Sequence, residues 1–444
     1  MPLLTASDKA LWRLALPMIL SNITVPLLGL VDTAVIGHLD SPVYLGGVAI
    51  GATATSFLFM LLLFLRMSTT GLTAQAFGAK NAPALARALV QPLLLAIAAG
   101  VVIALLRTPL ITLALHITGG SDAVLEQARR FLDIRWLSAP ASLGNLVLLG
   151  WLLGVQYARA PVILLVVGNV FNIVLDLWLV MGLHMNVQGA ALATVIAEYV
   201  TFALGLLMVH QVLHRRKISF AMLKTAWRGG IRRLLALNRD IMLRSLLLQL
   251  CFGSITVLGA RLGSETVAAN AVLMMFLTFT AYALDGFAYA VEAHSGQAYG
   301  ARDGSQLLQI WRAACRQAGF VALAFAVVYA LAGHAIIALL TSLPELQQLA
   351  GHYLIWQVVL PLVGVWCYLL DGMFVGATRA AEMRNSMAIA AAGFAVTLLT
   401  VPVLGNHGLW LSLAVFLALR GLTLALIWRH HWRGGSWFAH SDHA

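Results

Sequence analysis

The chain has 444 residues, of which 61% are hydrophobic and only 10% are charged. Because a soluble domain carries roughly 25% charged residues, this composition excludes an ordinary soluble protein and indicates one that crosses the membrane several times. The formal net charge of +11 would favour a nucleic-acid partner in a soluble chain, but the basic residues here lie almost entirely between apolar stretches, where they set membrane orientation, so we expect no nucleic-acid partner.

Twelve apolar stretches follow one another, and each can cross a hydrocarbon layer of ~30 Å as a helix. The pattern predicts an all-α polytopic membrane protein with six helices in each half. We expect an N-terminal lobe (1–210), an inter-lobe linker (211–237) and a C-terminal lobe with a short tail (238–444). The predicted spans are 11–37, 43–66, 88–108, 128–151, 161–182, 187–210, 238–260, 267–290, 312–334, 350–373, 386–404 and 408–428.

The first stretch combines two prolines with an acidic residue. Pro17 and Pro26 each remove a backbone hydrogen bond, so we expect this helix to bend and to act as a hinge. Asp32 follows on the same helix, where a carboxylate costs about 2.5–3.5 kcal/mol and therefore suggests a function. Since no small-residue cleavage site follows, we interpret this stretch as a retained first helix.

The fifth and sixth stretches carry a polar seam. In the segment NVFNIVLD, Asn172 and Asp176 follow Asn169 by three and seven residues, which places all three on one helix face. Thr194 and Glu198 lie one turn apart on the sixth stretch. Polar groups in such positions face the interior of a bundle, where they either bind a transported ion or hydrogen-bond helices to one another. For Glu198 both interpretations stay open.

Asp32 and Asp176 form the main candidate pair for ion coupling. Desolvation raises the pKa of a carboxyl group, and a second carboxylate nearby raises one member of the pair further. Such a pair can exchange a proton near neutral pH, and its titration belongs to both groups together.

The connection between the two halves sets the membrane orientation. Residues 210–239 are rich in Lys and Arg and contain no Asp or Glu, so we expect this segment in the cytoplasm. Alternation of the spans then places both termini there. Most loops on the opposite side, at 38–42, 182–187, 343–349 and 405–408, contain no Lys or Arg, but Arg129, Arg130 and Arg135 break this pattern.

The second half contains its own ionisable residues. Asp285 and Glu292 lie seven residues apart on one face of the eighth stretch, and Asp371 lies on the tenth. Arg244, on the seventh, is expected to be the counter-ion of one of them. Buried pairs of this kind are usually structural, which is the interpretation that we favour here.

The two halves share sequence motifs at a constant distance. AQAFGAKN at 74–81 recurs as GQAYGARD at 296–303, and GWLLG at 150–154 corresponds to GMFVG at 372–376. Because both eight-residue motifs precede basic loops on the same predicted side, we expect a parallel repeat, with the halves related by an axis along the membrane normal.

Motifs of several enzyme classes are missing from the sequence. It contains no GxxxxGK[ST], HExxH or GxSxG pattern, and no soluble domain large enough to hold one. We therefore expect no enzymatic activity, no catalytic residue and no cofactor other than a coupling ion.

The motifs taken together resemble the multidrug and toxic compound extrusion (MATE) transporters, in particular their DinF-like branch. The resemblance is carried by LALPMILSN, VDTAVIGHLD, AQAFGAKN and NVFNIVLD in the first half, and by YALDGFAYAVEAHSGQAYGARD and LDGMFVGATR in the second. It implies a twelve-helix fold with two lobes and the export of cationic or amphipathic organic compounds in exchange for H⁺ or Na⁺.

By motif position, the resemblance implies roles for individual residues. Asp32 matches the acid of the first helix, Asn172 and Asp176 the pair of the fifth, and Thr194 the hydroxyl of the sixth; either H⁺ or Na⁺ would bind there. Pro17 matches the bending proline.

In the C-terminal lobe the resemblance is weaker. Asp371 matches the acid of the tenth helix. The glutamate that another branch carries on the seventh helix is absent, since RSLLLQLCF stands there, and this favours coupling through the N-terminal lobe.

We therefore expect a monomeric, proton-coupled antiporter of a bacterial inner membrane that contacts lipid and small organic substrates. One alternative is a flippase for lipid-linked precursors, which would need cationic residues in its cavity; only Arg244 lies clearly within a predicted span. Another is a membrane scaffold that transports nothing.

Overall fold

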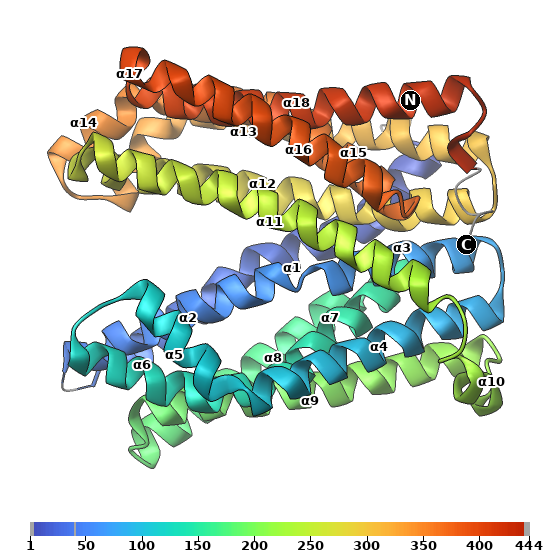
Figure 1. Ribbon diagram of the computed structural model, residues 1–444, viewed down its shortest axis with the longest axis horizontal. Coiled ribbons are helices and arrows are strands. Elements are labelled where there is room, and N and C mark those ends of the chain that lie inside the picture. Colours follow the sequence, from blue (N-terminus) through green and yellow to red (C-terminus); the bar gives the residue numbers. More distant parts are fainter. Residues whose placement is uncertain (1–3, 40, 439–444) are drawn as a thin grey trace. The chain divides into compact units, whose positions relative to one another are not determined.

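The computed structural model describes residues 4–39 and 41–438, with the side chains of residues 24–33 outside the description. Every regular element in this part of the chain is a helix (Figure 1). Among the described residues, eleven helical stretches are long and apolar enough to cross a membrane. Helix α1 (Ala6–Gly37), at the position of the first predicted span, adds a twelfth helix of sufficient length. The predicted all-α membrane fold is confirmed.

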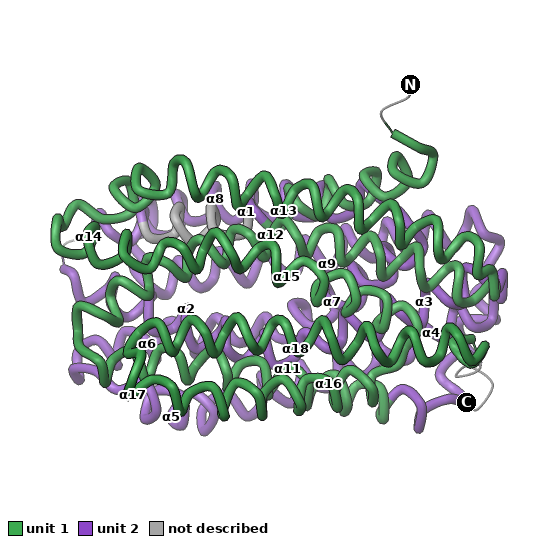
Figure 2. The backbone as a smooth tube through the Cα atoms, turned by 90° about the horizontal axis from the view of Figure 1, so that it is seen from above, with its two compact units in different colours: residues 1–22, 235–444 green, residues 23–234 purple. Residues whose placement is uncertain are grey.

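The chain forms two compact units, which Figure 2 distinguishes by colour. Unit 1 comprises residues 1–22 and 235–444, and unit 2 comprises residues 23–234. Helix α1 therefore contributes residues to both. Unit 2 continues with α2 (Pro42–Leu61), α3 (Phe64–Gly78), α4 (Ala82–Leu105), α5 (Arg107–Thr118), α6 (Asp122–Arg135), the 3₁₀ turn η1 (Trp136–Ser138), α7 (Ala139–Gly154), α8 (Ala160–Asp176), the π-helix η2 (Leu177–Gly182), α9 (Asn186–Arg215) and α10 (Phe220–Thr225).

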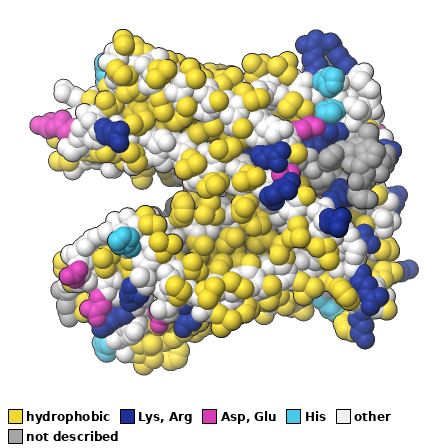
Figure 3. Space-filling view, in the orientation of Figure 1, with side chains coloured by type: hydrophobic (Ala, Val, Ile, Leu, Met, Phe, Trp, Pro, Cys, Tyr) yellow, Lys and Arg dark blue, Asp and Glu magenta, His cyan; other side chains and the backbone are white. Residues whose placement is uncertain are grey.

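Unit 1 is built from the second half of the chain. Its elements are α11 (Ile231–Leu262, whose first residues belong to unit 2), α12 (Ser264–Gly300), α13 (Gly304–Leu340), α14 (Pro344–His352), α15 (Leu354–Gly376), α16 (Ala380–Thr397), the 3₁₀ turn η3 (Leu398–Thr400), α17 (Val401–Leu404) and α18 (Asn406–Arg433). Many of its outward side chains are apolar: Leu331 and Leu339 on α13 are 84% and 87% exposed. Apolar side chains cover most of the face in Figure 3, as expected for helices in contact with lipid.

The first turns of α1 are held to unit 1 by contacts far apart in sequence. The indole nitrogen of Trp12 donates a hydrogen bond to Oε1 of Gln317 at 3.0 Å, and the Trp12 ring meets Phe287 edge-on with centroids 4.9 Å apart. The side-chain amide of Asn22 donates to the carbonyl of Tyr282 at 3.1 Å. These contacts explain why residues 1–22 group with the second half of the chain.

Both units pack their helices in the same pattern. In unit 2, α7 packs against α3 and α4, and α8 packs against α9. In unit 1, α15 packs against α12 and α13, and α16 packs against α18. The sequence repeat therefore corresponds to a repeated arrangement of helices within each unit.

The repeated motif forms the same turn in each unit. Lys80 and Arg302 both adopt a positive φ, of 53° and 54°. Asn81 and Asp303 then cap the next helix, and each side-chain oxygen accepts from a backbone N–H three residues on at 3.2 Å. Asn and Asp are favoured at this position because they satisfy a helix N–H that has no partner in the helix.

The glycines of the second motif allow two helices to approach closely. A Cβ on Gly150 would lie 2.7 Å from the carbonyl oxygen of Arg66, and one on Gly372 would lie 2.5 Å from that of Ala288. Contacts this short with backbone atoms require a shift of a whole helix. Glycine is therefore needed at both equivalent positions.

Replacing Gly372 with alanine is expected to lower the free energy of unfolding by about 1–3 kcal/mol, the usual cost of overpacking a well-packed core. Gly253 on α11 is the matched control, because a Cβ there would meet nothing within 4 Å. Thermal unfolding of both variants in detergent measures the difference. Equal midpoints for G372A and G253A would contradict the close approach.

Two sequence-based assignments need correction. The fourth predicted span is part of a longer helical stretch, 122–154, so Arg129, Arg130 and Arg135 belong to α6 and not to a loop. Arg244 is also not the only arginine within a span: Arg66 on α3 and Arg420 on α18 are each 3% exposed. Both residues fall inside predicted spans, 43–66 and 408–428, so Arg244 should not have been singled out; a membrane span tolerates a charge that is paired.

Candidate functional site

The polar seam predicted on the fifth span lies on α8. Asn172 and Asp176 are buried, at 1% and 0% exposure, and Asn169 is half-buried. Val170 and Val174 on the opposite face are 53% and 59% exposed. The helix therefore turns its apolar face outward and its amide and carboxyl groups toward the interior of unit 2, as the spacing predicts.

Asp176 occupies the point at which the helix changes its geometry. It is the last α-helical residue of α8, and the π-helix η2 follows directly. In this stretch the N–H of Leu183 donates to the carbonyl of Trp178, five residues earlier, at 2.9 Å. Such widened turns are uncommon and often mark functional positions.

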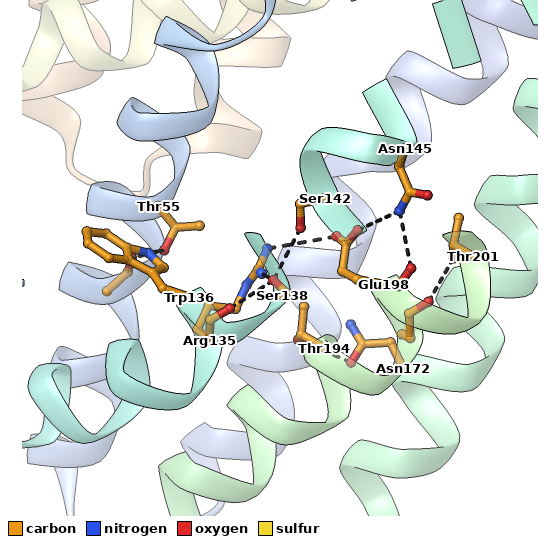
Figure 4. A network of polar contacts seen from close by, with 12 residues as sticks. Thr55, Arg135, Trp136, Ser138, Ser142, Asn145, Asn172, Thr194, Glu198 and Thr201 are labelled. Carbon is orange, nitrogen blue, oxygen red and sulfur yellow. Dashed lines mark hydrogen bonds and ion pairs between the residues drawn. The ribbon is translucent and has the colours of Figure 1, made fainter. Parts of the chain in front are cut away.

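Thr194 on α9 joins the seam from the neighbouring helix. Its hydroxyl donates to Oδ1 of Asn172 over 3.4 Å and to the carbonyl of Ala190 at 3.2 Å (Figure 4). The amide nitrogen of Asn172 is buried and has no hydrogen-bond partner among the described residues. The structure thus brings together Asn172, Asp176 and Thr194, three of the four residues predicted for ion coupling.

The fourth of these residues, Asp32, lies outside the described side chains, as does the hinge candidate Pro26. The backbone of α1 is helical through Pro17, Pro26 and Asp32. The roles of all three residues stay predictions.

Glu198 lies one turn beyond Thr194 on α9 and belongs to a second polar network. Its Oε2 accepts from the side-chain nitrogen of Asn145 at 3.0 Å, and its Oε1 lies 3.9 Å from a guanidinium nitrogen of Arg135 (Figure 4). Sequence reasoning missed both partners. Arg135 was assigned to a loop, although it falls inside the predicted span 128–151, and this was the available signal.

The Arg135–Glu198 pair is expected to contribute little to stability. Because it is long and Glu198 keeps 28% side-chain exposure, replacing Glu198 with glutamine should cost less than about 1 kcal/mol. Glu126→Gln, which removes an exposed ion pair with Arg130, is the control. A loss of several kcal/mol for E198Q alone, measured by thermal unfolding, would contradict this interpretation.

In unit 1, Asp371 is enclosed by two arginines. Arg244 on α11 donates from Nη2 to Oδ2 of Asp371 at 2.6 Å, so the predicted counter-ion is confirmed. Arg420 on α18 donates to the same oxygen. The side chains of Arg244, Asp371 and Arg420 are 8%, 12% and 4% exposed. Two guanidinium groups donate to this carboxylate, which supports the structural role favoured for it.

The remaining acidic candidates of unit 1 lie on α12. Asp285 is half-buried and Glu292 is 3% exposed. Their functional roles stay predictions.

Both halves of the chain match the same protein-family model. The MatE family model matches the chain twice, over residues 17–178 and 241–403, once in each half. Together these matches cover more than half of the sequence. The chain belongs to the MATE family.

Individual MATE relatives match over nearly the whole chain. DNA damage-inducible protein F of Escherichia coli (strain K12) is 83% identical over 439 residues, covering 99% of this chain and 96% of the relative. The probable multidrug resistance protein NorM of Acinetobacter baylyi is 24% identical, covering 94% of each chain. A crystal structure of the Vibrio cholerae MATE transporter VcmN has a TM-score of 0.85 at 22% identity, covering 98% of both chains. The chain is accordingly a membrane transporter of the MATE fold and not an enzyme.

Proposed function

We propose that this MATE protein is a secondary active antiporter that exports cationic or amphipathic organic compounds in exchange for H⁺. The observation that carries the proposal is the burial of Asp176, at 0% exposure, on a seam with Asn172 and Thr194. A carboxyl group in a membrane span is costly and is rarely kept without a function. Relatives named as probable multidrug resistance proteins support the substrate class.

In the proposed cycle, protonation of Asp176 or Asp32 removes a negative charge from unit 2. The change in charge would alter the bend of α1 near Pro17 and Pro26 and so lead to release of the substrate. Proline makes such a bend possible because it interrupts the helical hydrogen bonds. The two prolines lie on either side of the boundary at residue 22, where α1 passes from unit 1 to unit 2, and this supports α1 as the moving element. Solved MATE structures described as bent and straight are consistent with such a change.

We further propose an inner-membrane location with both termini in the cytoplasm and a monomeric chain. The basic, acid-free segment at 210–239 supports this orientation, since cytoplasmic loops carry an excess of Lys and Arg. Cysteine labelling of residues engineered into the linker 211–237 in intact cells tests it. Labelling by a membrane-impermeant reagent from outside would overturn the orientation.

The choice of coupling ion is tested by transport. Carboxylate, amide and hydroxyl oxygens at the seam suit Na⁺ as well as H⁺, and we propose H⁺ because a carboxyl group in a membrane span can take up and release a proton. Proteoliposomes with the purified protein are given a pH gradient or a Na⁺ gradient separately, and the flux of several fluorescent organic cations is recorded. We expect flux with the pH gradient alone. Flux driven only by Na⁺ would overturn proton coupling, and no flux with either gradient would favour the scaffold alternative.

A flippase for lipid-linked precursors is the other transport function to be weighed. It would require cationic side chains free to bind a pyrophosphate. Arg244 and Arg420 both donate to Asp371, which speaks against their serving as that site. We therefore retain the antiporter as the proposal.

A further inference from the structure

A pocket of about 410 Å³ lies at one end of unit 2, between the turn that follows α7 and the last turn of α9. We refer to it as the basic pocket. Its lining residues are Val155, Gln156, Tyr157, Val212, Arg215 and Arg216. The volume falls within the range of about 300–1,000 Å³ that is common for small-ligand sites.

We propose that the basic pocket binds the phosphate group of an anionic phospholipid. Arg215 is the last residue of the apolar helix 186–215. At 30 residues this helix is about 45 Å long, which matches a bilayer with its headgroup regions, so we expect the pocket at the depth of lipid headgroups. In Figure 3, Lys and Arg side chains gather at the end of unit 2 that carries α10. Basic pockets between transmembrane helices are suited to anionic headgroups.

The two arginines have charge available for an external anion. Among the described residues, no carboxylate forms an ion pair with Arg215 or Arg216, and both side chains are exposed. The guanidinium carbon of Arg216 lies 4.3 Å from the centroid of the Phe77 ring, a cation–π contact that holds this side chain in place. A fixed guanidinium beside a second one offers the paired N–H donors that phosphate oxygens prefer.

The arginines are not needed to complete the end of α9. The N–H groups of Arg216, Lys217 and Ile218 already donate to carbonyls of the last turn at 3.0, 3.1 and 3.0 Å. Basic residues often fulfil this capping role at helix C-termini. Here backbone N–H groups provide it, so the two guanidinium groups that line the pocket are available to a ligand.

The corresponding place in unit 1 is filled by the protein itself. It lies between the turn after α15 and the end of α18, where Arg379 donates to the carbonyls of Ser436 and Trp437 at 2.9 and 2.8 Å. Trp437 is 1% exposed and packs against Phe374. It also meets Tyr299, the motif residue that corresponds to Phe77 in unit 2.

The sequences at the two helix ends account for this difference. In unit 1, Gly434 caps α18 and Gly435 adopts a φ of 69°, after which Trp437 folds back onto the helices. In unit 2, Arg216 caps α9 and Lys217 takes the positive φ of 56°. In unit 1 an arginine of the turn, Arg379, donates to carbonyl oxygens beyond the helix end. In unit 2 the turn carries Tyr157 at that position, and the arginines lie at the helix end instead. We infer that an anionic oxygen ligand pairs with Arg215 and Arg216, as the carbonyl oxygens pair with Arg379.

The test uses the full-length purified protein in detergent, with short-chain phosphatidylglycerol, short-chain phosphatidylcholine and inorganic phosphate as three separate probes. Binding is measured by native mass spectrometry and by the shift of the thermal unfolding midpoint. We expect phosphatidylglycerol to bind and stabilise, and R215Q/R216Q to weaken that binding roughly 25-fold, because each interfacial arginine contributes about a factor of five. R215K/R216K should retain most of the binding.

The matched control is K224Q/R228Q, which removes two exposed charges from the same basic segment but outside the pocket. Unchanged phosphatidylglycerol binding by this variant supports the pocket. An equal loss in both glutamine variants, or equal binding of phosphatidylcholine, would overturn the proposal. Stabilisation by inorganic phosphate to the same extent as by phosphatidylglycerol would overturn the lipid as the source of the phosphate. Because transport is not measured, failure here leaves the antiporter proposal to its own test.

Discussion

Replacing Asp176 with asparagine is expected to reduce proton-driven export of organic cations to the level of protein-free liposomes. Asparagine has nearly the same shape, so the seam with Asn172 and Thr194 should persist, but it cannot take up and release a proton. The variant should remain folded, because the substitution keeps the volume of this buried side chain. Export is measured in proteoliposomes with an imposed pH gradient, and stability by thermal unfolding.

Asp133→Asn is the matched control for this experiment. Asp133 also lies in unit 2, but its side chain is 55% exposed and pairs with Arg107 at 3.2 Å near the end of α6. The same chemical change there should leave export unaltered. Normal proton-coupled export by D176N would contradict the mechanism proposed for unit 2.

The features that sequence reasoning predicted well are those encoded locally. The face of α8 that carries Asn172 and Asp176 follows from a helical spacing of four residues, and the structure buries it. The correspondence of AQAFGAKN with GQAYGARD predicts equivalent segments in the two halves, and both form the same turn, with a positive φ at Lys80 and Arg302. Both depend on residues that are close in the chain.

The ion pairs show where such reasoning stops. Arg420 lies 49 residues from Asp371 in the sequence, and Arg244 lies 127 residues from it. No local sequence pattern indicates that these three side chains are in contact. Arg135 was assigned to a loop for the same reason. A membrane span tolerates a charge that is paired with an opposite one. Tertiary packing determines which residue is the partner, so the sequence alone does not identify it.

The grouping of residues 1–22 with the second half of the chain also depends on packing. The internal repeat divides the sequence at the linker, whereas contacts such as that of Trp12 with Gln317 join the start of α1 to unit 1. The internal repeat therefore predicts which helices each half of the sequence contributes, but it does not predict every contact that these helices make.

Replacing Asp371 with leucine is expected to lower the free energy of unfolding by about 3–5 kcal/mol, the usual effect of removing one member of a buried ion pair. The change leaves Arg244 and Arg420 as two close, buried positive charges without a counter-ion. Their side chains are only 8% and 4% exposed, so water cannot easily replace the carboxylate. The unfolding midpoint in detergent should therefore fall strongly for D371L.

The triple variant R244M/D371L/R420M separates charge from shape. Replacing a buried ionic cluster by apolar side chains of similar volume is often neutral or stabilising, so the triple variant should regain most of the stability that D371L loses. If the cluster is structural, proton coupling should also persist in the triple variant, because Asp176 and the rest of the seam lie in unit 2. A stable triple variant that had lost its response to a pH gradient would instead assign Asp371 to the coupling machinery.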